Sequence, residues 1–120
     1  MKVRKVRGMG RGVFAERPYR AGEVIEVCPV IPLTIAEADT CSSTILDDYF
    51  FEWGPRRKAY ALALGYGSLF NHSDDPNAVF TCRIRKLQIE FRAKHAIAQG
   101  EQITIDYGWP DTTNMPPPRS

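Results

Sequence analysis

Two alternating runs between positions 78 and 93 constrain the fold more than any other part of the sequence. Apolar side chains recur there at every second position: Phe80, Cys82 and Ile84 on the first run, and Leu87, Ile89, Phe91 and Ala93 on the second. A period of two puts such residues on one face of an extended strand. Because the polar pair Arg85-Lys86 separates the runs, the pattern predicts a β-hairpin whose turn lies at that pair.

The rest of the chain shows further short β-prone segments with frequent turn signals, so we expect a mainly β fold. Strands are expected over residues 2–6, 23–31, 46–53 and 102–106, and either a strand or a helical turn over 59–64. The second of these is expected to break at Pro29, which has no backbone N–H to donate. Thr34 and Glu37 have the spacing of a capping box, which predicts a short helix to about Asp39.

Composition indicates one soluble, intracellular domain. The 120 residues are 43% hydrophobic and 25% charged, and no apolar run is long enough to span a bilayer. The basic N-terminal segment has no apolar stretch behind it, so it does not resemble a signal peptide. Three widely spaced cysteines, Cys28, Cys41 and Cys82, fit neither a disulfide framework nor a zinc knuckle and suggest buried thiols in a reducing compartment.

The charge is small overall but unevenly placed. A net charge of +2 is too small to predict nucleic-acid binding, and we expect none. Five basic residues could still bias the choice of partner through their field: Lys2, Arg4, Lys5, Arg7 and Arg11. Gly8, Gly10 and Gly12 lie among them without the spacing of a dinucleotide fingerprint, so we expect a glycine-lined turn between two strands, with backbone that a ligand could approach.

The stretch of residues 65–77 reads GYGSLFNHSDDPN and combines features of a turn with those of a binding site. Glycine permits sharp turns and close approach, and the Asp-Pro-Asn sequence favours a turn. The apolar pair Leu69-Phe70 is expected to anchor this loop in the core while Asn71 and His72 face a pocket.

The aromatic residues of segment 46–53 are expected to divide between the core and the wall of a pocket. Phe50 and Phe51 are expected on the core face of their strand. Tyr49 differs, because its hydroxyl needs a polar partner when buried and therefore suits the wall of a pocket.

Residue types weigh against the commoner catalytic sites. Ser73, His72 and Asp106 could in principle form a hydrolytic triad, but no nucleophile-elbow motif is present and Ser73 adjoins the histidine. His72 and His95 with scattered acids match no common ligand spacing, so no metal site is expected. The glycosylation signal at Asn71 is taken as chance, because nothing indicates secretion. What remains can orient a polar, flexible ligand without a metal or a covalent nucleophile.

Four sequence motifs occur in an order that is typical of a known enzyme family. They are GRG running into VFA at 10–15, DDYFF at 47–51, FNHSDDPN at 70–77 and GEQITIDYG at 100–108. The first two are weak alone, whereas the last two, about thirty residues apart with a hairpin between them, are highly specific. Through these motifs the chain resembles the SET-domain protein-lysine methyltransferases over residues 2–109.

The resemblance implies a β-clip fold of several small sheets, one or two short helices and a C-terminal pseudoknot, in which the last segment threads under an earlier loop. It places Tyr107 and Gly108 beside Asn71 and His72. The implied cofactor is S-adenosyl-L-methionine. The implied cofactor-binding residues are Gly10, Arg11, Gly12, Tyr49, Asn71, His72, Tyr107 and Trp109, and Tyr107 is also the implied catalytic residue.

The implied chemistry requires no nucleophilic side chain, because the sulfonium of the cofactor is already an activated methyl donor. A neutral lysine amine must lie in line with the S–methyl bond, and such positioning supplies much of a rate enhancement. Tyr107 is expected to orient the amine, and loop carbonyls to favour the developing positive charge. Since a nearby positive charge lowers the pKa of the amine, His72 is expected to bind the cofactor rather than to act as a base.

The sequence departs from many relatives in several ways. No cysteine follows Cys82, so a zinc module after the domain is not expected, nor is one before it. Trp109 is a candidate to cover the cofactor or close the lysine channel, with core packing as the alternative. Ile105 stands where many relatives have Phe or Tyr that helps set the number of methyl groups added, which leaves the product state open.

The build resembles the minimal stand-alone SET proteins of viruses and bacteria, some of which form homodimers. We expect a SET domain over residues 1–109 and a Pro-rich tail over 110–120, disordered or extended. The expected substrate is a lysine of a histone or histone-like protein, which would place the protein in the nucleus of a eukaryotic host. The alternatives are a non-histone substrate, such as a ribosomal or other basic protein, and a catalytically silent module that binds a peptide.

Overall fold

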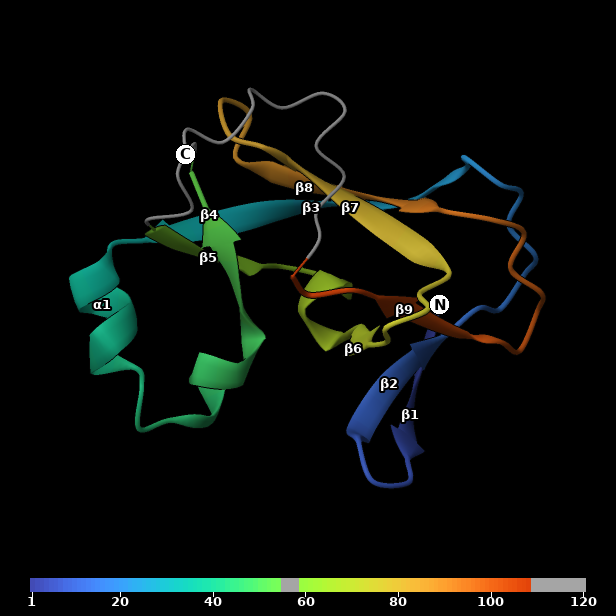
Figure 1. Cartoon of the computed structure of the whole chain (residues 1–120), viewed down its shortest axis with the longest axis horizontal. Coiled ribbons are helices and arrows are strands. Elements are labelled where there is room, and N and C mark those ends of the chain that lie inside the picture. Colours follow the sequence, from blue (N-terminus) through green and yellow to red (C-terminus); the bar gives the residue numbers. More distant parts are fainter. Residues whose placement is uncertain (55–58, 109–120) are drawn as a thin grey trace.

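A computed structural model describes residues 1–54 and 59–108, and in these ranges the strands form two sheets (Figure 1). The four-stranded sheet has the order β1-β2-β9-β6, and the five-stranded sheet has the order β4-β5-β3-β8-β7. The strands are β1 (Lys2–Val6), β2 (Gly10–Phe14), β3 (Val24–Leu33), β4 (Phe50–Trp53), β5 (Ala59–Ala63), β6 (Asn71–His72), β7 (Ala78–Arg83), β8 (Gln88–Ala93) and β9 (Gln102–Ile105). The prediction of a mainly β fold of small sheets is confirmed.

The β7–β8 hairpin has the predicted pairing. Phe80 lies opposite Phe91 and Cys82 opposite Ile89, and all four side chains are buried. The turn is longer than predicted, because β7 ends at Arg83 and backbone bonds close the turn over 83–87. Leu87 therefore has a φ of 52° and is 46% exposed, so the prediction that it continues the inward row is wrong.

β3 continues to Leu33, so the predicted break at Pro29 is wrong. Pro29 is instead the position at which the strand changes partner: residues 24–29 pair with β8, and residues 30–33 pair with β5. Proline is tolerated where a ladder is already interrupted. The Pro29 carbonyl accepts a hydrogen bond from the Leu64 N–H at 2.9 Å, which attaches the end of β5 to the same point.

Short helices fill the segment between β3 and β4. The predicted capping box is present: the Thr34 side chain accepts from the Glu37 N–H, and the Glu37 carboxylate accepts from the Thr34 N–H, at the start of α1 (Ile35–Thr40). Residues 46–49, predicted as strand, belong to the 3-10 helix η1 (Ile45–Tyr49). Thr44 caps η1 through its hydroxyl, which competes with an extended backbone. A second 3-10 helix, η2 (Gly67–Leu69), precedes β6.

An aromatic cluster packs the loop 65–77 against the five-stranded sheet. Phe70 is 1% exposed and packs edge-on against Phe91, with ring centroids 4.9 Å apart. Phe51 packs against Phe80 and Phe91, whereas Phe50 is only half-buried. Phe70 thus anchors the loop as predicted, with Leu69 partly buried beside the core.

The prediction that the thiols are buried is correct for two of the three cysteines. Cys28 and Cys82 are buried, whereas Cys41 at the end of α1 is partly exposed. Burial, with the negative charge of Glu26 as a further cause, raises the pKa of the Cys28 thiol to about 12. No helix in the described ranges is long and apolar enough to cross a membrane.

Candidate active site

β6 and β9 bring the two specific motifs into contact. Asn71 pairs with Thr104 and His72 with Ile105 in a parallel ladder, and the Ser73 N–H donates to the Ile105 carbonyl at 2.9 Å. In Figure 1 this pair lies at the centre of the molecule, between the β1–β2 hairpin and the five-stranded sheet. We call the contact between residues 70–77 and residues 101–108 the crossing.

Tyr107 is held in the crossing at both ends. Its backbone N–H donates to Nδ1 of His72 at 3.1 Å, and its hydroxyl donates to the Phe70 carbonyl at 2.7 Å. Tyr107 remains 50% exposed and lines a cavity, so a ligand can reach it. Burial, the largest cause, raises the pKa of the Tyr107 phenol above its ordinary value. The hydroxyl is therefore protonated at neutral pH, and its oxygen lone pairs can still accept a hydrogen bond.

The hydrogen bonds of His72 define its tautomer. Because Nδ1 accepts from the Tyr107 N–H, the ring proton of the neutral imidazole lies on Nε2. Nε2 is 2.9 Å from Oδ1 of Asp74, which accepts that proton. Both ring nitrogens are thus occupied, and His72 holds the backbone of Tyr107 in place.

Asn71 joins the crossing to the N-terminal glycine motif. Its Nδ2 donates to the Arg11 carbonyl at 2.9 Å and to Oε1 of Gln102 at 2.8 Å. A Cβ on Gly12 would meet Oε1 of Gln102 and come within 2.8 Å of Nδ2 of Asn71. Glycine at this position therefore permits the close approach of β2 to the amide.

A small cavity adjoins the crossing on the side of η1 and β4. It has a volume of about 180 Å³ and is lined by Asp48, Tyr49, Glu52, Ser68, Phe70 and Tyr107 among others. Aromatic walls with acidic residues suit a cationic or amine-bearing side chain. Tyr49, expected in a pocket wall, lies in one.

Asn77 has a structural role that its residue type did not reveal. The side chain is buried; its Nδ2 donates to the Gln102 carbonyl at 2.8 Å and to Oε2 of Glu101 at 2.9 Å, and its Oδ1 accepts from the Thr104 N–H at 2.9 Å. The bond from Asn77, with one from the Ala98 N–H, holds the pKa of Glu101 below its usual value. The position of Asn77 directly before an apolar strand is the feature of the sequence that could have indicated this role.

Glu26 is a second residue with a structural role that its residue type did not reveal. Its Oε1 accepts from the Tyr66 N–H at 3.1 Å, and Oε2 is buried without a partner among the described residues. A Cβ on Gly65 would collide with this carboxylate. Glu26 therefore fixes the start of the loop 65–77 against β3.

The structure thus brings most of the predicted site residues into two connected groups. Arg11 and Gly12 approach Asn71 from β2, the strand that Gly10 begins, while Tyr49 and Tyr107 share the cavity. His72 bonds to Tyr107 between the two groups. Trp109 and the tail 110–120 lie outside the described residues. Within the described ranges no three His, Cys, Asp or Glu residues gather as metal ligands.

Comparisons with known proteins agree on one family. The SET domain family model matches residues 10–108. A histone-lysine N-methyltransferase of Schizosaccharomyces pombe, specific for H3 lysine-37, is 33% identical over 109 residues, which cover 90% of this chain and 73% of that protein.

Solved structures agree with this match. A provisionally named histone methyltransferase of Plasmodium falciparum is 31% identical, with a TM-score of 0.67 over 89% of this chain and 91% of that one. The Neurospora SET domain protein DIM-5, a histone lysine methyltransferase, has a TM-score of 0.68 at 19% identity, over 95% of this chain and 54% of that one. At 19% identity the likeness shows the fold alone, and it confirms the predicted fold class.

Proposed function

Because this chain belongs to the SET-domain family of protein-lysine methyltransferases, we propose that it methylates a lysine of a histone or histone-like protein with S-adenosyl-L-methionine as the donor. The family uses this cofactor. The observation that carries the proposal is the position of Tyr107, whose hydroxyl lies 2.7 Å from the Phe70 carbonyl beside the aromatic cavity.

We assign cofactor binding to Gly10, Arg11, Gly12, Tyr49, Asn71, His72 and Tyr107. A Cβ on Gly10 would meet nothing within 4 Å, so the backbone there is open to a polar ligand. The exposed Arg11 guanidinium fits a carboxylate, and Tyr49 supplies an aromatic surface. These groups suit a ligand that carries a carboxylate and an aromatic base. Trp109 stays a candidate to cover it.

The substrate lysine is assigned to the cavity between Tyr49 and Tyr107. When bound, the cofactor supplies a methyl group on a positively charged sulfur. The Tyr107 hydroxyl donates a hydrogen bond to the Phe70 carbonyl, so the lone pairs of its oxygen are left to accept a hydrogen bond from an N–H of the neutral lysine amine. That bond orients the nitrogen lone pair toward the methyl carbon. As the amine gains positive charge, the Phe70 carbonyl and the Tyr107 oxygen favour it.

A histone substrate is favoured over other basic proteins because the Schizosaccharomyces pombe relative is specific for H3 lysine-37. Such a substrate would place the protein in the nucleus of a eukaryotic cell. Three statements remain predictions of the resemblance: the end of the domain at Trp109, the viral or bacterial subgroup and a homodimer. The resemblance makes no prediction of the number of methyl groups added.

Incubation of the purified chain with radiolabelled cofactor, core histones and, separately, a cell extract tests this proposal. We expect label on a histone lysine with the wild-type chain and strongly reduced label with Tyr107→Phe. Label on extract proteins alone would favour a non-histone substrate. Label on neither, with cofactor binding intact by calorimetry, would favour the silent peptide-binding module.

A further inference from the structure

The β1–β2 hairpin carries an unusual concentration of positive charge. Residues 1–15 contain five of the 16 basic residues and none of the 14 acidic ones. The remaining 105 residues therefore hold eleven basic and fourteen acidic residues, so the small net charge of the chain conceals two regions of opposite sign. In Figure 1 the hairpin, coloured blue, projects from the rest of the molecule.

The register of the hairpin places cations where they repel one another. Lys5 lies directly opposite Arg11 on one face, and Arg7 follows in the turn, which Gly8 closes with a φ of 80°. Like charges in directly opposed positions destabilise a sheet. All three side chains are exposed, and none forms an ion pair within the described ranges. The Lys5–Arg11 pair is therefore unfavourable in the folded protein, and a bound anion would reduce the repulsion between the two charges.

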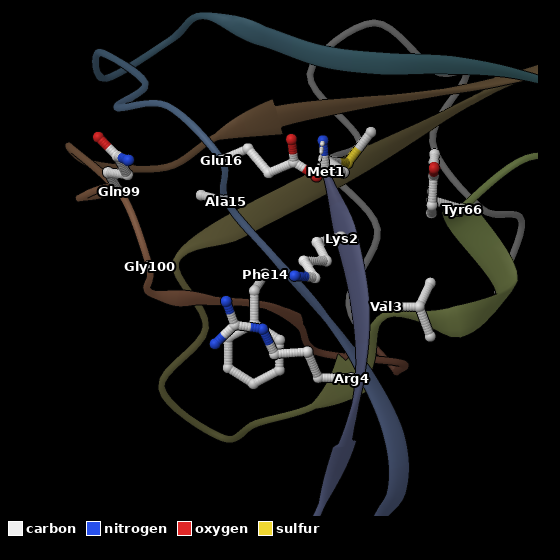
Figure 2. A pocket seen from close by; sticks show the side chains of 10 residues that line it. All are labelled: Met1, Lys2, Val3, Arg4, Phe14, Ala15, Glu16, Tyr66, Gln99 and Gly100. Carbon is white, nitrogen blue, oxygen red and sulfur yellow. Dashed lines mark ion pairs between the residues drawn. The ribbon is translucent and has the colours of Figure 1, made fainter.

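The other face is also basic. Lys2 and Arg4 alternate on it, and Arg4 lies over the Phe14 ring with its guanidinium carbon 5.4 Å from the centroid. Figure 2 shows both side chains at an open hollow of about 660 Å³ that also includes Tyr66, Gln99 and one acid, Glu16. Neither Lys2 nor Arg4 pairs with a carboxylate among the described residues.

We propose that the β1–β2 hairpin is a binding element for double-stranded DNA, with the four cations that are not assigned to the cofactor, Lys2, Arg4, Lys5 and Arg7, on phosphates. A two-stranded ribbon fits the major groove of B-form DNA, and five residues of strand span about 17 Å, along which the duplex carries roughly ten phosphates. Cations on both faces and at the tip match a groove, which has phosphates on both walls. A membrane surface would match one basic face only, and the deep, narrow major groove of A-form RNA does not admit a ribbon.

Fluorescence anisotropy of a labelled 20-base-pair duplex, titrated with the full chain between 50 and 200 mM salt, tests the proposal. Four phosphate contacts predict a slope of log K against log salt concentration of about −3.6. The double variant Lys5→Gln/Arg7→Gln should reduce the magnitude of that slope by about 2 and weaken binding roughly tenfold at the lowest salt. Neither residue is assigned to the active site.

The matched control is Arg85→Gln/Lys86→Gln, which removes two exposed cations from the β7–β8 turn. It should bind the duplex within about twofold of wild type. Equal losses in the two double variants would overturn the proposal, as would no duplex binding at 50 mM salt. Tighter binding to an RNA duplex of the same length, or to phosphatidylserine vesicles, would replace DNA with that partner. Circular dichroism of each variant checks that the fold is retained.

Discussion

The two edges of the four-stranded sheet use their polar side chains in opposite ways. At the β6 edge, the side chains of Asn71, His72 and the nearby Asn77 form hydrogen bonds with β2, with β9 and within the loop 65–77. At the β1 edge, the cations of the hairpin make no ion pair within the described ranges. The same small sheet therefore has one edge with satisfied polar groups and another with uncompensated charge.

The two edges illustrate two kinds of binding surface: one in which hydrogen bonds fix the side chains, and one in which charges are left without ion-pair partners. The crossing fixes Tyr107 from its backbone and its hydroxyl, which is what an aligned transfer reaction needs. The hairpin holds charges in place without partners, which suits a polyanion whose phosphates supply the missing bonds. Substitutions at the two edges should accordingly differ in what they damage.

The largest effect is expected from Asn77→Ala, which removes three side-chain hydrogen bonds of the crossing. Leaving the Thr104 N–H and the Gln102 carbonyl unpaired should lower the free energy of unfolding by about 3 kcal/mol. Urea denaturation followed by circular dichroism measures it. Asp75→Ala, in the same turn but with an exposed side chain, is the control and should change little. Similar values for the two would mean that Asn77 does not hold the crossing.

Tyr107→Phe should reduce turnover about 100-fold while the dissociation constant of the cofactor stays within a few-fold, because the lost oxygen orients the amine. Methyl-transfer kinetics and calorimetry give the two quantities. Tyr66→Phe removes a hydroxyl outside the crossing and should retain turnover. Unchanged activity of Tyr107→Phe would refute the role assigned to that oxygen.

Gly12→Ala tests how closely β2 must approach the crossing. The added methyl group would collide with the side chains of Gln102, Asn71 and Val6, so we expect a loss of about 2 kcal/mol in unfolding free energy and weaker cofactor binding. Gly108→Ala is the steric control, since its Cβ would lie 3.6 Å from Asp106. Thermal unfolding with and without the cofactor compares the two. Tolerance of Gly12→Ala would show that β2 and Asn71 can separate freely.

Lys5→Gln should have the smallest effect and the opposite sign. Removal of the like-charge neighbour of Arg11 is expected to raise the unfolding free energy by a few tenths of a kcal/mol at low salt, and the gain should vanish as salt screens the pair. Lys86→Gln, at a turn without such a pair, should leave stability unchanged. A loss of stability in Lys5→Gln would show that Lys5 makes a stabilising interaction in the hairpin, which would contradict the repulsion assigned to it.

Local patterns predicted local structure well. The alternation around Phe80 and Phe91 and the Thr34–Glu37 spacing act over a few residues, so both appeared in the structure. Errors arose where distant partners decide the outcome. Pro29 does not end the strand, because at this point β3 changes its pairing partner from β8 to β5. Leu87 does not face the core, because it belongs to a turn that is longer than predicted.

The candidate site was predictable from motifs rather than from periodicity. Asn71, His72 and Tyr107 were named through the family resemblance, and the structure brings them together. Asn77 and Glu26 escaped notice because their partners lie 24 to 40 residues away in sequence. A buried polar residue shows its purpose only when its partners are known.

The crossing also has a consequence for the order of events during synthesis. Asn71 and Gln102, which bond to each other, are 31 residues apart, so the loop leaves the ribosome roughly 2–6 s before β9 at ordinary translation rates. Until then, His72 Nδ1 cannot accept the hydrogen bond from the Tyr107 N–H, and the Phe70 carbonyl cannot accept the one from the Tyr107 hydroxyl. The nascent chain can form the β7–β8 hairpin in that interval, but it acquires its reactive geometry only when β9 docks.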